Sequence, residues 1–226
     1  DQSYPVFRNV SSELGLDTFN LSGGVVIDDF NNDSLLDIFT TSWSSDAIPK
    51  LFIGEKNGSF KDASSSSGFE GIYGGLNVEP ADFNNDGNLD LYILRGAWLE
   101  GAGDMPNSLI RNNGDGTFTD VSFSQGLAES NYPTQTAGWA DFDNDGDLDL
   151  FVGNETTGGA VAPCQLFRND GNAGFTDIAI IAGVTNERFT KGVSWGDYNN
   201  DSYPDLYVSN FRGKNRLYKN NGDSTF

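Results

Sequence analysis

Four nine-residue segments of the chain place oxygen-bearing side chains at alternate positions. They begin at Asp29, Asp82, Asp141 and Asp197, and each reads Asp, an aromatic residue, Asn or Asp, Asn, Asp, three variable residues and a closing Asp. If such a loop curls, positions 1, 3, 5 and 9 offer side-chain oxygens and position 7 offers a backbone carbonyl. Calcium binds about 6–8 oxygens of this kind at roughly 2.3–2.6 Å. The spacing therefore predicts a calcium site in each segment.

The predicted ligands occupy the same five positions of each segment, with the residue at position 7 acting through its carbonyl. In chain order they are Asp29, Asn31, Asp33, Leu35 and Asp37; Asp82, Asn84, Asp86, Asn88 and Asp90; Asp141, Asp143, Asp145, Asp147 and Asp149; and Asp197, Asn199, Asp201, Tyr203 and Asp205. Position 6 has to turn sharply, which suits Gly87 and Gly146, whereas Ser34 and Ser202 make the first and fourth segments weaker matches. Up to four calcium ions (Ca²⁺) are expected.

Three other interpretations of these segments compete with a calcium site. Solvated acidic turns would need no ion, but four copies in register count against that reading. Magnesium prefers octahedral sites that keep several waters. An EF-hand loop closes with Glu at position 12, whereas here Asp closes at position 9 between strand-like residues. Because clustered carboxylates repel unless neutralised, an ion that staples its repeat together is favoured over an ion that binds a ligand.

Composition excludes whole classes of function. The 226 residues include no histidine and one cysteine, so histidine-dependent catalysis, histidine-ligated zinc and thiolate clusters are excluded. The formal net charge of −20 repels nucleic acid and anionic membrane surfaces, and we expect neither as a partner. The longest apolar run, residues 178–184, is too short to insert into a bilayer. Because the first residue is Asp1, we expect either a removed leader or an excerpt of a longer protein.

The stretches of sequence on either side of each acidic segment have the pattern of short β-strands. Apolar and β-branched residues flank each segment, and an Asn-Gly turn at residues 57–58 indicates a hairpin. A second landmark, a phenylalanine after a turn, recurs at Phe60, Phe118, Phe175 and Phe226. A repeat of about 50–60 residues with four antiparallel strands predicts an all-β fold built of propeller blades. A β-sandwich, the alternative, gives no reason for this period.

The repeat divides the chain into one predicted β-propeller region, residues 1–226. Within it we expect an orphan outer strand and connector at 1–20, followed by four blades. Their predicted ranges are 21–67, 68–124, 125–180 and 181–226, the last with an incomplete outer strand.

The acidic segments and the phenylalanine landmark together resemble a known family. They are similar to the FG-GAP/VCBS repeats of integrin-α-like propellers, and more closely to the cartilage-acidic-protein-like (ASPIC/UnbV-associated) group. The residues that carry the closer resemblance are Leu94-Arg-Gly-Ala-Trp-Leu, Pro106-Asn-Ser-Leu-Ile-Arg-Asn-Asn-Gly, Gly138-Trp-Ala-Asp-Phe-Asp-Asn-Asp-Gly and Pro163-Cys-Gln-Leu-Phe-Arg-Asn. The resemblance implies seven blades, whereas this chain holds four repeats.

The ends of the chain leave three assemblies open. The strand expected at residues 5–10 could close a four-bladed ring, complete the last blade of a neighbouring copy and so build a filament, or precede further blades beyond residue 226. Self-association through the terminal strands is therefore one expectation.

These features predict an extracellular protein, either secreted or at the cell surface. Its expected function is adhesion, matrix contact or assembly through a protein or glycan ligand, and not catalysis. The alternatives are a structural filament subunit and a propeller-based lyase or glycosidase, but the acids outside the metal segments form no constellation for the latter.

Four further features carry smaller expectations. Cys164 is expected to be buried and inert, and Asn20 and Asn154 are candidate glycosylation sites. The insertion at residues 96–105 could present a binding loop. The last expectation is that the tryptophans at positions 43, 139 and 195 pack between blades.

Overall fold

The computed structural model describes residues 7–18, 21–97, 104–158 and 161–226. In that part of the chain the regular structure is almost entirely β, which confirms the all-β prediction. The helical structure among the described residues is α1 (Ala179–Ala182) and the 3₁₀ turns at Ser64–Ser66 and Gly171–Ala173. The strands are β1 (Ser22–Asp28), β2 (Asp37–Ser42), β3 (Lys50–Gly54), β4 (Phe60–Asp62), β5 (Asn77–Ala81), β6 (Asp90–Leu94), β7 (Ser108–Asn112), β8 (Phe118–Asp120), β9 (Thr134–Ala140), β10 (Asp149–Asn154), β11 (Gln165–Asn169), β12 (Phe175–Asp177), β13 (Thr190–Gly196), β14 (Asp205–Asn210) and β15 (Arg216–Tyr218).

These strands form four antiparallel sheets in which each strand pairs with the next one along the chain. Three sheets have four strands, in the orders β1-β2-β3-β4, β5-β6-β7-β8 and β9-β10-β11-β12. The fourth sheet has three strands among the described residues, β13-β14-β15. Each sheet lies inside one of the four ranges expected from the repeat.

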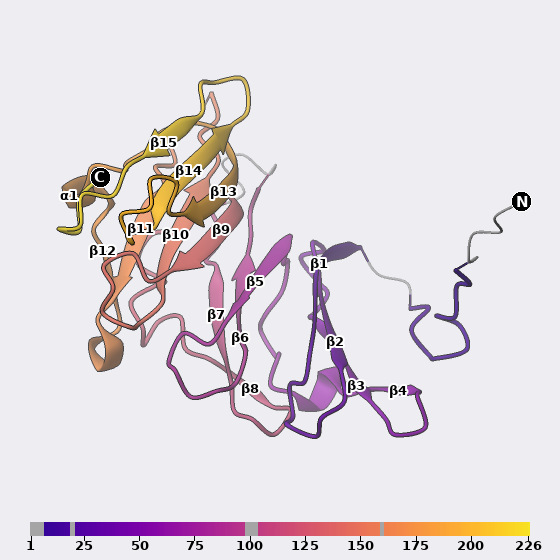
Figure 1. Ribbon diagram of the computed structural model, residues 1–226. Coiled ribbons are helices and arrows are strands. Elements are labelled where there is room, and N and C mark those ends of the chain that lie inside the picture. The colour runs from indigo at the N-terminus through magenta and orange to yellow at the C-terminus, as the bar shows by residue number, and fades with distance from the viewer. Residues whose placement is uncertain (1–6, 19–20, 98–103, 159–160) are drawn as a thin grey trace, which may run out of the picture.

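The sheets follow one another along an arc, with β1–β4 at one end and β13–β15 at the other (Figure 1). The first strand of each sheet packs beside the first strand of the next, β1 on β5, β5 on β9 and β9 on β13. This is a propeller-like arrangement in which the acidic segments all join the first two strands of a sheet.

An apolar cluster fills each of the three spaces between neighbouring sheets. Alternation along a strand produces it, because successive side chains point to opposite faces of the sheet. In β6, Leu91 and Ile93 pack against the first sheet, whereas Tyr92 and Leu94 pack against the third. We call these two surfaces of a sheet its preceding face and its following face. Each large apolar side chain buried there contributes about 1.5–3 kcal/mol.

The sheets approach each other too closely for a side chain at one position of β1. A Cβ atom on Gly23 would lie 2.3 Å from the carbonyl oxygen of Gly75, in the segment that leads into β5. Glycine is therefore required where the first and second sheets meet.

The orphan strand expected at residues 5–10 is not formed in its described part. Residues 7–10 have no strand pairing, and the Phe7 side chain is 94% exposed. A turn follows at residues 11–15, in which Leu14 N–H donates to the Val10 carbonyl and Leu16 N–H to the Ser11 carbonyl. The prediction of a strand is therefore wrong for residues 7–10.

Candidate metal centre

Each acidic segment forms a curled loop between the first and second strands of its sheet. Two residues of each loop adopt the left-handed backbone conformation, at positions 4 and 6. Their φ angles are 59° and 68° at Asn32 and Ser34, 56° and 86° at Asn85 and Gly87, 61° and 98° at Asn144 and Gly146, and 61° and 73° at Asn200 and Ser202. Serine in this conformation costs roughly 1–2 kcal/mol. The turn expected at position 6 is thus present in all four loops, with or without glycine.

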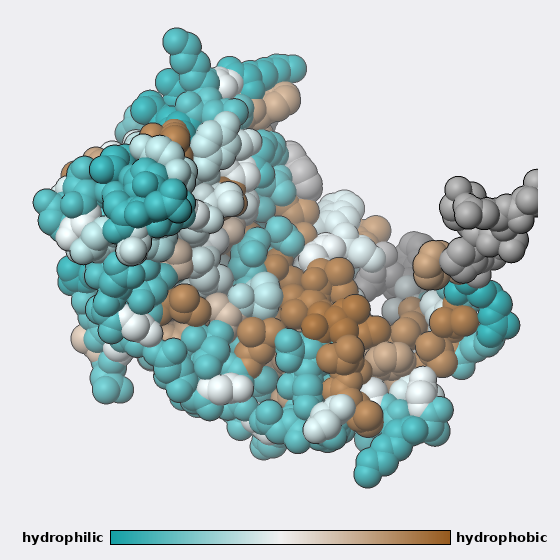
Figure 2. Space-filling view, in the orientation of Figure 1, coloured by the Kyte–Doolittle hydropathy of each residue, from teal (hydrophilic) through white to brown (hydrophobic). Residues whose placement is uncertain are grey.

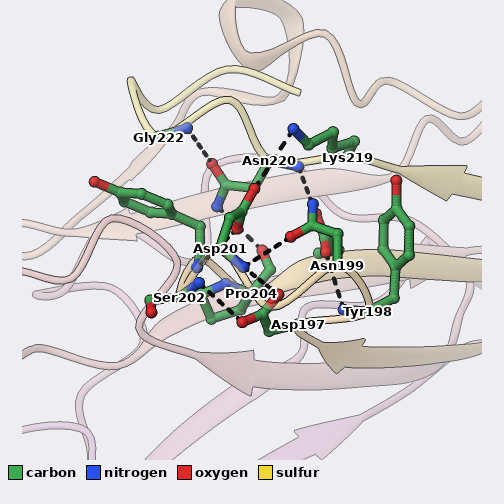
Figure 3. Close-up of polar contacts among 11 residues, drawn as sticks. Asp197, Tyr198, Asn199, Asp201, Ser202, Pro204, Lys219, Asn220 and Gly222 are labelled. Atoms are coloured by element: carbon green, nitrogen blue, oxygen red, sulfur yellow. Dashed lines mark hydrogen bonds and ion pairs between the residues drawn. The ribbon is translucent and has the colours of Figure 1, made fainter.

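The fourth loop illustrates the hydrogen bonding that curls the chain (Figure 3). The two carboxylate oxygens of Asp197 accept from the backbone N–H groups of Asp201, at 3.1 Å, and Ser202, at 2.8 Å. The Asn199 side-chain oxygen also accepts from Asp201 N–H, at 2.9 Å. Asp201 in turn accepts from Tyr203 N–H at 3.1 Å. Side-chain oxygens of positions 1, 3 and 5 therefore accept from the backbone N–H groups of positions 5, 6 and 7.

The same bonds recur in the other three loops. Position 1 accepts from the N–H groups of positions 5 and 6, and position 5 accepts from the N–H of position 7, in the loops that begin at Asp29, Asp82 and Asp141. Positions 1 and 5 thus bind the same backbone N–H groups in all four loops, while the convergence of the predicted ligands on one ion in each loop stays a prediction. That the position 7 carbonyls of Leu35, Asn88, Asp147 and Tyr203 act as ligands stays a prediction.

The third loop has the most concentrated acid. Asp141, Asp143 and Asp149 each offer a carboxylate oxygen, and these oxygens lie within 4.8 Å of one another. One oxygen of Asp143 is buried and has no hydrogen-bond partner among the described residues. A buried carboxylate oxygen without a donor is costly unless a cation faces it. The donor set, oxygen throughout, fits calcium.

Burial raises the pKa of several of these carboxyl groups. It raises the pKa of Asp149 to about 8 and that of Asp90 to about 7. Burial is also the main cause of the raised pKa of Asp143, and the neighbouring charges of Asp145 and Asp141 add to it. The pKa of Asp37 is raised for the same first reason. Ionised carboxylates are held here at an energetic cost that a bound divalent cation would offset.

The closing Asp at position 9 is buried in every loop and ties the loop to the sheet. Asp37, Asp90, Asp149 and Asp205 are at most 1% exposed. In each, one oxygen accepts from the N–H of position 2 and the other from an N–H at the end of the third strand. In the third loop these donors are Phe142 and Asn169. Position 9 is therefore an internal brace as well as a predicted ligand.

Position 4, which the ligand pattern leaves out, connects neighbouring loops. The Asn32 side chain donates to the Asn88 side-chain oxygen of the second loop at 2.9 Å, and Asn85 donates to Asp147 of the third at 2.8 Å. Asn144 donates to the Ser202 carbonyl of the fourth at 3.2 Å. All four repeats carry Asn at position 4, which could have indicated a role for this residue. Its hydrogen-bond partner could not be predicted, because it lies in another repeat.

A second asparagine, in the segment that ends the third strand, connects sheets in the same way. The Asn169 side chain donates to the carbonyls of Phe83 in the second loop, at 2.9 Å, and Leu148 in its own loop, at 3.2 Å. Asn220, drawn with Pro204 in Figure 3, makes the equivalent bonds to the carbonyls of Phe142 and Pro204. The buried side-chain amides of Asn169 and Asn220 thus each connect two neighbouring acidic loops.

The smaller expectations meet mixed outcomes. Cys164 is buried and free, as predicted. Asn154 is fully buried and donates to the Pro163 carbonyl, so its prediction as a glycosylation site is wrong. Trp195 packs between sheets as expected, whereas Trp43 is 54% exposed. Asn20 and residues 98–103 of the insertion lie outside the described residues.

Comparison with known proteins finds proteins of similar sequence and a solved structure of similar fold. Cartilage acidic protein 1 of Xenopus tropicalis is 33% identical over 153 residues, which are 66% of this chain and 22% of that protein. The Homo sapiens protein of the same name is 31% identical over 151 residues, 65% of this chain and 21% of that protein. The chain therefore spans about a fifth of the length of these relatives.

A solved structure shares the fold. It is that of a lectin from Agrocybe aegerita, described for its specific recognition of non-reducing terminal N-acetylglucosamine. The TM-score is 0.51 at 18% identity, over 89% of this chain and 50% of that chain. At this identity the likeness concerns the fold alone.

The family model described as the FG-GAP-like repeat matches residues 29–93, 98–152 and 158–208. These ranges cover well over half of the chain, and each spans at least one acidic loop or the strands that hold it. The resemblance stated from the sequence is confirmed, and the chain belongs to the FG-GAP-like repeat family.

Proposed function

We propose that this chain is a calcium-binding propeller region in which one Ca²⁺ in each acidic loop holds its repeat together. The observation that carries the proposal is the third loop, where three carboxylates converge within 4.8 Å and one buried oxygen of Asp143 has no partner among the described residues. The other loops share the backbone hydrogen bonds of this loop, but carry Asn at position 3, whose side-chain oxygen accepts from the N–H of position 5. Oxygen donors alone select a hard cation.

The proposed role of the ion is structural. Each loop is fixed to its own sheet through the buried Asp at position 9, and to the next loop through the Asn at position 4 of the first three repeats. An ion that neutralises the loop would therefore stabilise both the sheet and its contact with the neighbouring sheet. No ligand has to approach for this role.

Removal of calcium tests the proposal. We expect the melting temperature to fall when EDTA replaces calcium and to recover when calcium is restored. A ligand that binds only the folded state stabilises it by about 2.7 kcal/mol per site at a concentration 100 times its Kd. Isothermal titration of the chelated chain should give up to four sites, and magnesium at equal concentration should restore less stability. A melting temperature that is indifferent to EDTA would contradict the proposal.

For the protein as a whole we propose an extracellular role in adhesion, matrix contact or assembly, without catalysis. The support is the family and the relatives named cartilage acidic protein 1. The proposed ligand is a protein or a glycan. No helix among the described residues is both long and apolar enough to cross a membrane.

A further inference from the structure

The second sheet carries a hollow at the end that faces away from the acidic loops. Arg95 lines this hollow and directly follows β6, whose other end begins at Asp90, the closing residue of the second acidic loop. The hollow has a volume of about 430 Å³, within the range of about 300–1,000 Å³ that is typical of small-molecule sites. The first sheet covers the preceding face of the second sheet, and the third sheet covers its following face. The hollow is therefore not a surface left open at an end of the arc.

Arg95 occupies a position at which the third and fourth repeats carry an uncharged amide. Its equivalents, each five residues after the closing Asp of the loop, are Asn154 and Asn210. The Asn154 side chain donates to the Pro163 carbonyl, just before the third strand, at 2.8 Å, and Asn210 makes the equivalent bond. Arg95 makes the same bond to the Pro106 carbonyl at 2.7 Å. An amide is thus enough for this brace, and the positive charge at residue 95 is additional to it.

The Arg95 guanidinium is 96% buried as part of a residue that is 4% exposed, and it forms no ion pair with a carboxylate among the described residues. Its Nε donates to the Tyr73 carbonyl and its Nη1 to the Ser108 hydroxyl, whereas Nη2 donates to no described residue. Asp120 is reached only through Ser108, whose hydroxyl donates to it at 3.3 Å. Burial lowers the pKa of Arg95 from 12.5 to about 10, so the group stays charged at neutral pH. A buried charge is costly unless an opposite charge approaches it.

The rest of the hollow combines apolar surface with a hydrogen-bond acceptor. Tyr73, which is 42% exposed, and Phe123, which is 90% exposed, line it together with Met105. The exposed carboxylate of Asp120 lies in the same lining. It repels a second negative charge in a ligand but accepts hydrogen bonds from hydroxyl groups. A ligand that suits all of these groups has one carboxylate, several hydroxyls and an apolar ring face.

We propose that this hollow is a binding site for a sugar that carries one carboxylate. The Arg95 guanidinium pairs with the carboxylate through charge-assisted hydrogen bonds, Asp120 accepts from the ring hydroxyls, and Phe123 packs on the apolar face of the ring. The net charge of −20 does not prevent this, because the five residues of β6 separate the hollow from the acidic loop by roughly 17 Å. Physiological salt screens exposed charges beyond about 8 Å. This ligand class deepens the proposed adhesion role and rests on it, but not on the proposed calcium role.

Titration of the whole chain in calcium, followed by NMR chemical shifts, tests the proposal with galacturonic acid and galactose, which differ in the carboxylate. We expect galacturonate to bind at least about tenfold more tightly than galactose, and Arg95→Asn to remove that difference. Arg95→Asn copies the third and fourth repeats and keeps the brace, so the melting temperature should change little. Phe123→Ser, which copies the residue at this place in the first repeat, should weaken binding about two- to tenfold. Ile180→Ser, at the equivalent and 86% exposed position of the third repeat, is the matched control and should bind like the unchanged chain.

Three results would overturn the proposal: no binding of galacturonate, equal binding of the two sugars, or unchanged binding of galacturonate by Arg95→Asn. Acetate provides a further arm, because it offers the carboxylate without the ring. Acetate that competes with galacturonate at equal concentration would overturn the choice of a sugar, since any carboxylate would then fill the site. None of these results alters the response of the melting temperature to EDTA, so a failure here is distinct from a failure of the calcium proposal.

Discussion

At the scale of single residues, one aspartate can serve the fold and the site together. Asp149 accepts from Phe142 N–H at 3.0 Å and from Asn169 N–H at 2.8 Å, and it also lies in the acidic cluster of the third loop. Asp143 belongs to the same cluster but leaves one oxygen without a donor among the described residues. The two side chains are therefore expected to respond differently to the loss of a charge.

Replacing each of them by asparagine separates the two roles. Asp149→Asn turns an NH₂ group toward a buried N–H, which should cost about 1–3 kcal/mol whether or not calcium is present. Asp143→Asn reproduces the residue found at position 3 of the other loops and relieves repulsion from Asp141 and Asp145. It should destabilise the chain in calcium and leave it equally or more stable in EDTA. Urea unfolding in both buffers measures this, and a loss of stability for Asp143→Asn in EDTA would contradict it.

Spacing within one segment predicted Asp141, Asp143 and Asp149, whose carboxylates lie together in the third loop, because the curl of a loop is a local property. Spacing did not reveal the bridges of Asn85 and Asn169, since their acceptors lie in other repeats and only the packing of sheets brings them together. Burial of the sequon at Asn154 was hidden because its side chain bonds Thr134, Pro163 and Gln165, which are distant in sequence within the same repeat. What the sequence leaves undetermined at this scale is contact across the interfaces.

At the scale of elements, the strands follow from alternation and turn residues. The hairpin expected at the Asn-Gly turn of residues 57–58 is found, with β3 before the turn and β4 after it. A strand was also expected at residues 5–10, but residues 7–10 pair with no strand among the described residues. Repetition therefore predicted the members of each sheet and not what lies beyond them.

The strand β5 carries a half-buried acid where the equivalent strands β1 and β9 carry none. Glu79 is equivalent to Val26 and Gly138 in the repeat, and burial raises its pKa to about 7 from 4.5. The folded state then binds more protons than the unfolded state between about pH 4.5 and 7. The stabilising effect is complete below pH 4.5 and is lost as the pH rises through 7.

The Glu79→Gln variant should remove this part of the pH dependence. In calcium at fixed ionic strength, the free energy of unfolding of the unchanged chain should fall more steeply between pH 4.5 and 7 than that of Glu79→Gln. The difference should be on the order of 2 kcal/mol, because one pKa unit corresponds to about 1.4 kcal/mol and the half-buried carboxylate keeps some solvent. Urea titrations at half-unit intervals measure it, and parallel curves for the two proteins would refute the assignment. Glu70→Gln, at an exposed position, is the control.

At the scale of the whole molecule, the excess of acid has a specific location. Of the 33 Asp and Glu residues, many occupy the four loops, so part of the net charge of −20 is concentrated along one edge of the arc. Each bound Ca²⁺ would lower that charge by two. Among the described residues the loops are also unequal, because the third loop is bridged to a loop on each side and the fourth loop to one.

This inequality predicts that the same substitution will have different effects in the third and fourth loops. Asp141 and Asp197 both occupy position 1, and each accepts two equivalent backbone N–H bonds. The third loop, however, accepts a hydrogen bond from Asn85 of the second loop and donates one from Asn144 to the fourth. The fourth loop only accepts the bond from Asn144. In calcium, Asp141→Asn should lower the melting temperature more than Asp197→Asn, because losing the ion there loosens two interfaces between sheets. In EDTA, where neither loop holds an ion, the two variants should differ less. Equal effects in calcium would mean that each loop stabilises its own sheet alone.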